Sequence, residues 1–361
     1  MQKSDGMNYA PQGKPSPVVK AGEFAFAAIA LDHGHIYGMC NGLTEAGADL
    51  KWVYDPDPNK VKAFCEKFPQ VKVASSEEEI LQDEEIKLVA GAAVTSLRCD
   101  LGMRVMDAGK DYFTDKAPLT TLEQLERAKE KVRTTGKKYM VYYSERLHVE
   151  SAIYAGYLIQ DGAIGKVVQV IGLGPHRLNA PSRPEWFFEK DKYGGILCDI
   201  GSHQIEQYLF YAGVKDGQVV RSQIGNYNNP KYPELDDFGD CTIVGDNGIT
   251  NYFRVDWFTP DGLGTWGDGR TIILGTEGYI ELRKYINIGT STDSNHVFLA
   301  NGKGEYHYEV SGQVGYPFFG QLILDCMNRT ENAMTQEHAF KAAELGVKAQ
   351  LQAAELTGRN I

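Results

Sequence analysis

The stretch Phe24–His35, FAFAAIALDHGH, decides the fold class of this 361-residue chain. Its first half is a short apolar run, which is typical of a parallel strand buried on both faces. The polar turn Leu31–His35 then leads into a helix-like stretch that continues to Leu43. A strand, a tight turn and a helix in this order predict the opening unit of a doubly wound α/β sheet.

The same alternation of apolar runs and helical stretches continues to residue 145. Further strands are predicted at residues 50–54, 71–73, 86–94, 112–114 and 139–143, with helices between them. Strands that alternate with helices at this spacing indicate right-handed βαβ units. We therefore predict a Rossmann dinucleotide-binding domain with a parallel sheet over residues 23–145.

After residue 146 the pattern changes to longer segments that alternate between apolar and polar residues. They predict strands at residues 167–172, 240–244, 251–257, 270–274, 279–283 and 297–300. With helices at 151–160, 318–327 and 338–356, residues 146–361 are predicted to form an α+β domain with an open, mostly antiparallel sheet. Residues 1–22 are polar and rich in proline and glycine, which predicts a flexible N-terminal arm without the apolar core of a signal peptide.

Length and charge limit the classes of function. A chain of 40.0 kDa is long enough for two domains. Its formal net charge of −11 argues against a nucleic-acid or anionic-membrane partner. The six cysteines are scattered without a CxxC pair, which suits a reducing compartment, and no apolar run is long enough to span a bilayer. We expect a cytoplasmic protein.

In a doubly wound sheet, ligands bind where the strands end at their carboxyl side. The GxGxxG fingerprint is absent after the first predicted strand, and its three glycine places hold Ala30, Asp32 and His35. Asp55 follows the second strand, where a carboxylate accepts ribose hydroxyls and repels a 2′-phosphate, so NAD is favoured over NADP. The predicted cofactor-binding residues are Ala30, Asp32, His33, Gly34, His35, Ile36, Asp55, Thr95, Ser96, Asp115 and Lys116.

Asp32, His33 and His35 also admit a metal-binding interpretation. Two histidines at i, i+2 and a carboxylate are a known ligand set. No further histidine or cysteine lies nearby in the sequence, and a cofactor loop already explains the position of these residues. We predict no metal site.

A second polar group lies in GGILCDIGSH, residues 194–203. Asp199 and His203 are four residues apart and are predicted on one face of a helix, behind the pair Gly194-Gly195. The glycines would allow a ligand to approach the backbone closely. Lys116 ends a buried strand at the ligand edge, where a desolvated ammonium group can stabilise a developing alkoxide. The simpler alternatives are that Asp199 and His203 form a structural pair on the helix and that Lys116 is an ordinary solvent-exposed lysine.

The order of several short motifs resembles the glucose–fructose oxidoreductase, inositol dehydrogenase and rhizopine-catabolism family (Gfo/Idh/MocA), over about residues 23–358. The motifs are AGK at 108–110 with DKAP at 115–118, GAIG at 162–165, GG with DIGSH at 194–203, and LGTEG at 274–278. Asp115 and Ala117 depart from the family's glutamate–lysine–proline pattern. Lys116, Asp199 and His203 are all present.

The resemblance implies an NAD(P)-dependent dehydrogenase acting on a sugar, inositol or related polyhydroxy compound. His203 would serve as the base, Asp199 would orient it and Lys116 would polarise the reacting oxygen; Lys116 is the alternative base. A redox-assisted glycoside hydrolase or lyase with retained NAD, and a non-catalytic dinucleotide-binding regulator, are the alternatives. Predicted substrate-binding residues are Lys116, Arg146, His176, Arg177, Trp186, Tyr193, Asp199 and His203.

An open sheet with an exposed apolar face is otherwise prone to aggregate, so it is also expected to form a subunit interface. We predict a homodimer or homotetramer through the C-terminal sheet.

Overall fold

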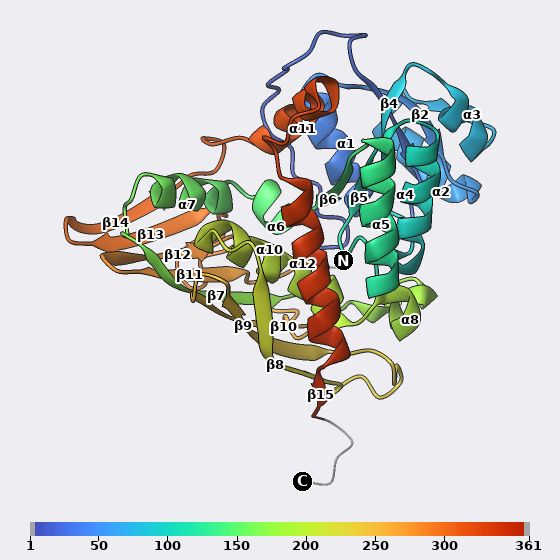
Figure 1. Ribbon diagram of the computed structural model, residues 1–361. Helices are drawn as coiled ribbons and strands as arrows, with labels where there is room; N and C mark the ends of the chain where they lie inside the picture. The colour runs from blue at the N-terminus through green and yellow to red at the C-terminus, as the bar shows by residue number, and fades with distance from the viewer. Residues whose placement is uncertain (1–3, 357–361) are drawn as a thin grey trace. The chain divides into compact units, whose positions relative to one another are not determined.

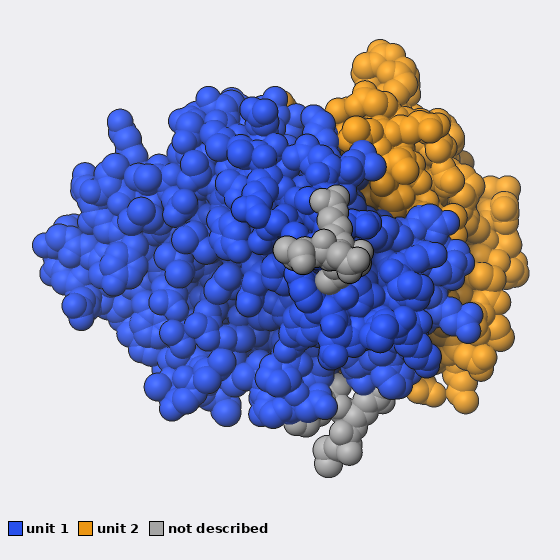
Figure 2. Space-filling model, turned by 90° about the horizontal axis from the view of Figure 1, so that it is seen from below, with its two compact units in different colours: residues 1–6, 143–314, 341–361 blue, residues 7–142, 315–340 orange. Residues whose placement is uncertain are grey.

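The computed structural model describes residues 4–356, which form two compact units (Figure 2). Unit 2 comprises residues 7–142 and 315–340, and unit 1 comprises residues 4–6, 143–314 and 341–356. The predicted arm is thus divided between the units, and its residues 1–3 lie outside the described part. The segment 315–340, which the sequence assigned to the C-terminal domain, belongs to unit 2.

Unit 2 is built on a parallel sheet of six strands in the order β3-β2-β1-β4-β5-β6 (Figure 1). Its elements are β1 (Ala25–Ile29), α1 (His35–Glu45), β2 (Asp49–Tyr54), α2 (Pro58–Lys67), β3 (Lys72–Val73), α3 (Glu77–Gln82), β4 (Ile86–Gly91), a 3₁₀ turn (Thr95–Leu97), α4 (Arg98–Asp107), β5 (Asp111–Asp115), α5 (Leu122–Thr135), β6 (Tyr139–Tyr142) and α11 (Pro317–Asn328). This strand order confirms the predicted doubly wound Rossmann sheet.

Local signals explain where the helices of unit 2 begin and end. Asp57 caps α2 by accepting a hydrogen bond from the N–H of Asn59, and Pro58 supplies the fixed φ of the first turn. Thr121 caps α5 in the same way, and Gly136 ends that helix with φ of 65°. The central strands of the sheet are covered on both faces, and every residue of β5 and β6 is buried, including Asp111 and Asp115.

The helix α11 joins unit 2 through its aromatic residues. The rings of Phe318 and Phe319 lie 5.9 and 6.4 Å from Phe113 on β5. Phe319 also occupies the space beside Gly42 on α1, where a Cβ would lie 2.4 Å from the ring. Apolar periodicity predicted this helix correctly, but periodicity does not reveal which sheet a helix covers.

Unit 1 is built on a mixed, open sheet of nine strands in the order β14-β13-β12-β11-β7-β10-β9-β8-β15. Its elements are α6 (Ser144–Leu147), α7 (Glu150–Gln160), β7 (Val167–Pro175), 3₁₀ turns at Ala180–Ser182 and Glu185–Phe188, α8 (Lys190–Tyr193), α9 (Ile196–Asp199), α10 (Gly201–Ala212), β8 (Gly217–Gly225), β9 (Phe238–Gly245), β10 (Thr250–Asp256), β11 (Arg270–Gly275), β12 (Gly278–Arg283), β13 (His296–Asn301), β14 (Gly304–Glu309) and β15 (Ala354–Glu355). The helix α12 (Gln336–Leu351) crosses from unit 2 into unit 1 at residue 341.

One face of this sheet carries the core of unit 1. The helices α7 and α10 cover this face (Figure 1), and α9 packs on it as well. Burial alternates residue by residue along β9 and β11. The parallel pairs β7–β10 and β8–β15 are the exceptions to an otherwise antiparallel sheet, so the predicted sheet type is confirmed.

Three strands of this sheet were not predicted, and the last helix ends at Leu351 instead of Leu356. A bulge between Val219 and Arg221 interrupts the alternation of β8. The edge strand β14 is exposed along most of its length, and only Tyr306 and Tyr308 give it an aromatic face. With two residues, β15 is too short for any periodicity.

Candidate active site

The carboxyl ends of β1, β2, β4 and β5 lie in register at one edge of the parallel sheet. Ile29 pairs with Tyr54 and with Gly91, and Gly91 pairs with Thr114. The loops that follow these four residues therefore start side by side. These loops carry most of the predicted cofactor-binding residues; Asp115 is the last residue of β5, and His35 and Ile36 are the first residues of α1, where the side chain of Ile36 is fully buried.

Ala30 makes the tight turn at the end of β1 without a glycine. Its φ is 61°, in the left-handed region, and its N–H donates to the carbonyl of Tyr54. Its own carbonyl accepts from the N–H of Ala92, so the turn is held to both neighbouring strands. The conformation that the first fingerprint glycine usually supplies is thus present, at the steric cost of a Cβ.

At the start of α1, the N–H of His35 donates to Nδ1 of His33, and the N–H groups of Ile36 and Tyr37 donate to the carbonyls of His33 and Gly34, each at 3.2 Å. Gly34 precedes the helix without a side-chain cap, and the first turn contains no acidic residue. Backbone N–H groups at such a helix start bind a pyrophosphate. The space beside Gly34 is narrow, since a Cβ there would lie 2.5 Å from the carbonyl of Met7 and 2.4 Å from the side chain of Asn8.

Asp55 fits the ribose-binding place but also stabilises its own turn. Its Oδ2 accepts the N–H of Leu31 at 2.6 Å, and its Oδ1 accepts the N–H of Asp57 at 2.9 Å. Each carboxylate oxygen keeps a second lone pair for a ribose hydroxyl. Lys60 lies 3.9 Å from Oδ1 of Asp55 and 2.6 Å from Oδ1 of Asp32, so this corner also contains a cation.

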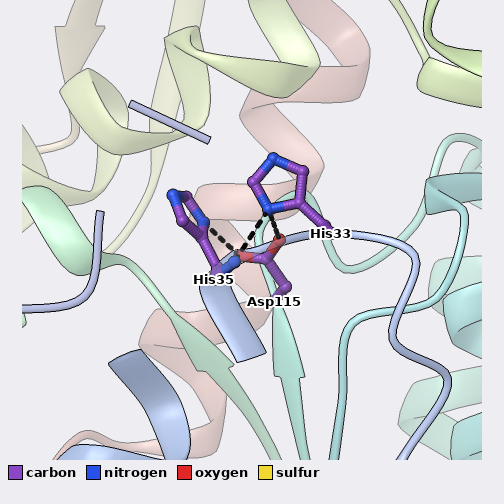
Figure 3. Close-up of side chains that lie close together, drawn as sticks. All are labelled: His33, His35 and Asp115. Atoms are coloured by element: carbon purple, nitrogen blue, oxygen red, sulfur yellow. Dashed lines mark hydrogen bonds and ion pairs between the residues drawn. The ribbon is translucent and has the colours of Figure 1, made fainter. Parts of the chain in front are cut away.

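The carboxylate beside the two histidines is Asp115 and not Asp32 (Figure 3). Its Oδ1 lies 2.8 Å from Nδ1 of His35, and its Oδ2 lies 3.1 Å from Nδ1 of His33. All three side chains are buried. The sequence pointed to Asp32 because it is adjacent to the histidines, whereas Asp32 is engaged by Lys60 and by the N–H of Val94.

Arg98 connects this group to Lys116. Its Nη2 lies 3.1 Å from Oδ2 of Asp115, and its Nη1 donates to the carbonyls of Lys116 and Ala117. The N–H of Lys116 donates to Oδ1 of Asp115 at 2.8 Å, and the peptide bond after Lys116 is cis. Through Asp115, the two histidines are linked to the backbone of Lys116. The ligand atoms of His33, His35 and Asp115 lie within 4.8 Å of one another, a spacing at which they could hold a metal ion.

The charges of this group follow from burial and proximity. Burial lowers the pKa of His33 to about 3, with the His35 ring acting in the same direction and Asp115 opposing it. Burial alone would raise the pKa of Asp115, but His35, Arg98 and His33 hold it well below its usual range. At neutral pH the carboxylate of Asp115 is therefore ionised, and His35 Nδ1 donates to it.

Thr95 and Ser96 form the short turn after β4. Thr95 is buried, and the carbonyl of Ser96 accepts a hydrogen bond from the side chain of Gln124. This turn belongs to the same edge as Ala30 and Asp55, as the sequence predicts.

In unit 1, Asp199 and His203 lie on two consecutive helices. Asp199 is the last residue of α9 and His203 is in the first turn of α10, and Ile200 joins them with helical φ and ψ. Both side chains are buried, and the ring of His203 lies 6.4 Å from that of Tyr143. The predicted single helix is therefore interrupted at Ile200.

The glycine pair has a different role from the predicted one. Gly194 and Gly195 have φ of 88° and 87°, where side chains are disfavoured. A Cβ on Gly195 would lie 2.1 Å from the side chain of Gln350, which accepts a hydrogen bond from the N–H of Leu197. The close approach is made by Gln350 of α12, a contact that no local pattern predicts.

Four of the predicted substrate-binding residues have structural partners. Arg146 forms a buried ion pair with Glu206, with Nε–Oε distances of 2.8 and 3.0 Å, and its guanidinium lies over the Phe210 ring. Arg177 donates to the carbonyls of Ser4, Pro260 and Leu263. The Tyr193 hydroxyl accepts the N–H of Asp236, and Trp186 packs on Phe187.

His176 lies within a polar cluster that the sequence did not reveal. Its Nε2 is 3.8 Å from Oε1 of Glu145, and Oε2 of Glu145 accepts hydrogen bonds from Lys284 and Gln204, each at 2.9 Å. Burial would raise the pKa of Glu145, but Lys284, His203 and His176 hold it below its usual range. Glu145 and Lys284 are 139 residues apart, so no sequence spacing indicates the pair.

Three buried polar atoms around His176 have no hydrogen-bond partner within residues 4–356. They are Oε1 of Glu145, Nε1 of Trp257 and Oγ1 of Thr259. The Trp257 ring lies 5.5 Å from the His176 ring, and the N–H of Thr259 donates to the carbonyl of His176. Unpaired buried polar atoms are rare in folded proteins, and each of them indicates a ligand or ordered water.

Comparisons with known proteins give a family match for the sequence of each of the two sheet-containing regions. Residues 32–143 match the oxidoreductase family with an NAD-binding Rossmann fold, and residues 154–281 match the GFO/IDH/MocA C-terminal domain. The chain belongs to the Gfo/Idh/MocA family of oxidoreductases. It is therefore an enzyme of a family that binds NAD(P) and acts on sugars and inositols.

Individual relatives of this Gfo/Idh/MocA protein differ in cofactor. It is 28% identical over 286 residues to a scyllo-inositol 2-dehydrogenase (NAD(+)) of Bacillus subtilis, covering 77% of each chain. A scyllo-inositol 2-dehydrogenase (NADP(+)) of the same organism is 26% identical over 147 residues, 41% of this chain and 40% of that one.

A crystal structure of a putative oxidoreductase from Erwinia carotovora atroseptica is 51% identical, with a TM-score of 0.90, and the match covers 93% of this chain and all of that one. The hydrolase or lyase and the regulator alternatives find no support in these matches. Within residues 4–356, none of the helices combines the length and the apolar character that crossing a bilayer requires.

Proposed function

We propose that this protein is an NAD-dependent dehydrogenase that oxidises a secondary alcohol of a sugar, an inositol or a related polyhydroxy compound. The observation that carries the substrate class is the set of unpaired buried atoms at His176. A carboxylate oxygen, an indole N–H and a hydroxyl are the groups that bind the neighbouring hydroxyls of a polyol.

The cofactor residues of this proposal lie at the edge of the parallel sheet. The start of α1, which has no acidic residue in its first turn, would hold the pyrophosphate, and Asp55 would hold the adenosine ribose hydroxyls. A bound oxidised nicotinamide would supply the acceptor for the hydride of the alcohol carbon. The carboxylate of Asp55 disfavours a 2′-phosphate, which supports NAD as the preferred cofactor.

Proton transfer is assigned to the predicted catalytic residues. His203 removes the hydroxyl proton as the C–H bond gives up its hydride, Asp199 orients the imidazole, and Lys116 stabilises the developing alkoxide. Asp115 and Arg98 hold the backbone of Lys116 on both sides, which reduces the freedom of its side chain at the end of β5. Lys116 belongs to unit 2 and His203 to unit 1, so their joint action is part of the proposal.

The test is a screen of inositols, pentoses and hexoses with NAD, with NADH formation followed by absorbance. We expect turnover with at least one polyol and losses in kcat of about a hundredfold or more in Lys116→Met and His203→Asn, with NADH binding retained. Lys62→Met, an exposed lysine of α2, is the control. Full activity in both site variants, or no oxidation of any polyol by protein that binds NADH, would refute the proposal.

The open face of the nine-stranded sheet is proposed as the surface of a homodimer or homotetramer. Leu274 and Tyr279 are opposite each other on β11 and β12 and are 44% and 48% exposed. Light scattering of the purified protein should give a molar mass that is a multiple of 40.0 kDa, and the Tyr279→Arg substitution should lower this mass. A monomeric mass for the wild-type protein would rule out this interface.

A further inference from the structure

We propose that His296, His307 and Glu309 form a binding site for a divalent ion of the zinc class at the edge of the nine-stranded sheet. The three residues lie on the hairpin β13–β14, at the outer end of the sheet (Figure 1). In the antiparallel register, His296 is opposite Glu309 and Phe298 is opposite His307. Residues that are paired, or two apart along a strand, share a face, so all three side chains rise on the same side.

The protonation of His296 prepares one nitrogen for a ligand. Its Nε2 lies 2.9 Å from the carbonyl oxygen of Asp293, which can only accept, so Nε2 carries the proton. In the neutral ring, Nδ1 then has a lone pair, and it faces Nε2 of His307 at 2.9 Å and Oε1 of Glu309 at 3.7 Å. Histidines that bind metals commonly donate their other N–H to a backbone carbonyl in this way.

The distances suit a small ion with nitrogen and oxygen ligands. Zn²⁺ binds both at about 2.0–2.1 Å in a tetrahedral arrangement, which separates neighbouring ligand atoms by about 3.4 Å. The observed distances from His296 Nδ1 lie on either side of this value, and the three ligand atoms are within 4.8 Å of one another. Two imidazoles and one carboxylate select zinc-class ions over Mg²⁺ or Ca²⁺, which prefer oxygen ligands.

The surroundings hold two of the three groups in place. His296 is fully buried, and the ring of His307 stacks on Phe298 with a centroid distance of 4.4 Å and an interplanar angle of 5°. Arg283 is opposite His296 on β12, but its guanidinium is engaged by Glu281 and Asn287. Glu309 is exposed and completes the set from solvent. An ion here would tie the exposed edge strand β14 to β13.

The site is not part of the proposed dehydrogenase chemistry. Two strands, β12 and β11, separate it from β7, the strand that leads into His176. We therefore expect a structural ion, which stabilises the folded hairpin by binding it in preference to the unfolded chain.

The test uses the untagged full-length protein after treatment with a chelator. Zn²⁺ affinity is measured by competition with a chromophoric chelator, and Co²⁺ is used as a spectroscopic probe of four-coordinate geometry. The variants are His307→Gln and Glu309→Gln, two exposed residues whose substitution leaves the core of the sheet unchanged. Glu305→Gln is the matched control, because Glu305 lies on the same strand and the same face without belonging to the group.

We expect one Zn²⁺ per chain, an increase in Tm on adding Zn²⁺, and affinity at least tenfold weaker in both variants but unchanged in Glu305→Gln. The visible absorption of Co²⁺ should appear in the wild-type protein and disappear in His307→Gln. If micromolar Zn²⁺ does not bind, or if all variants bind it equally, the three residues form only a hydrogen-bonded histidine pair with an exposed acid, and the proposal is wrong.

Discussion

Oδ1 of Asp115 accepts a hydrogen bond from Nδ1 of His35 at 2.8 Å, across 80 residues of sequence (Figure 3). The same oxygen accepts the N–H of Lys116, and Oδ2 faces Arg98. One ionised carboxylate therefore holds the loop after β1, the start of α4 and the end of β5 together. The proposed catalytic lysine takes its position from this carboxylate.

Asp115→Asn should destabilise unit 2, because it leaves the buried guanidinium of Arg98 without a counter-charge. Removing one partner of a buried ion pair costs roughly 3–5 kcal/mol in free energy of unfolding. Urea denaturation measures this cost. Asp107→Asn, which removes an exposed partner of Lys131, should change the free energy by less than about 1 kcal/mol. Equal effects of the two substitutions would contradict the role given to Asp115.

His33 should make the protein less stable as the pH falls below neutrality. Its pKa is about 3 in the fold and 6.5 in the unfolded reference, so below pH 6.5 the unfolded chain binds a proton that the folded chain does not. The contribution of His33 to the free energy of unfolding is complete above pH 6.5, and about 2 kcal/mol of it is lost by pH 5. Urea denaturation at pH 7 and pH 5 measures how much the free energy of unfolding changes with pH in the wild-type protein and in His33→Gln. The idea fails if the variant keeps the wild-type pH dependence.

Asp55→Ala should weaken the preference for NAD over NADP. The substitution removes the charge that repels a 2′-phosphate and leaves Lys60, 3.9 Å away, as an attractive charge. The ratio of kcat/KM with NAD to kcat/KM with NADP should fall at least tenfold. The double variant Asp55→Ala/Lys60→Ala should restore part of this ratio. Asp57→Ala, which removes only the cap of α2, is the control. An unchanged ratio in Asp55→Ala would remove Asp55 from cofactor selection.

Glu145→Gln should lower stability and raise KM for the polyol. Lys284 is fully buried, and the substitution deprives it of its carboxylate partner, at a cost of roughly 3–5 kcal/mol. Glu145→Gln/Lys284→Met removes both charges, so its free energy of unfolding should recover while KM stays high. If KM in the double variant returned to the wild-type value together with the free energy of unfolding, Glu145 would be a structural residue and not a contact for substrate.

The sequence by itself determined the class of each half of the chain. Apolar runs such as Phe26–Ile29 are continuous because a parallel strand is covered on both faces, and the alternation along β9 exists because only one face is covered. The ends of the strands then locate the candidate ligand edge, since Ala30, Asp55 and Asp115 each follow or finish a predicted strand. These signals are local, so no knowledge of tertiary contacts is needed to see them.

Only the tertiary structure decided which side chains become partners. Asp115 and not Asp32 joins the histidines, and Glu145 joins Lys284. Gln350 fills the space at Gly195, and His296 lies beside His307 across the β13–β14 hairpin. Periodicity records how much of each residue is buried, but it carries no information about which distant segment covers it. The register of the sheets and the path of α12 supply that information.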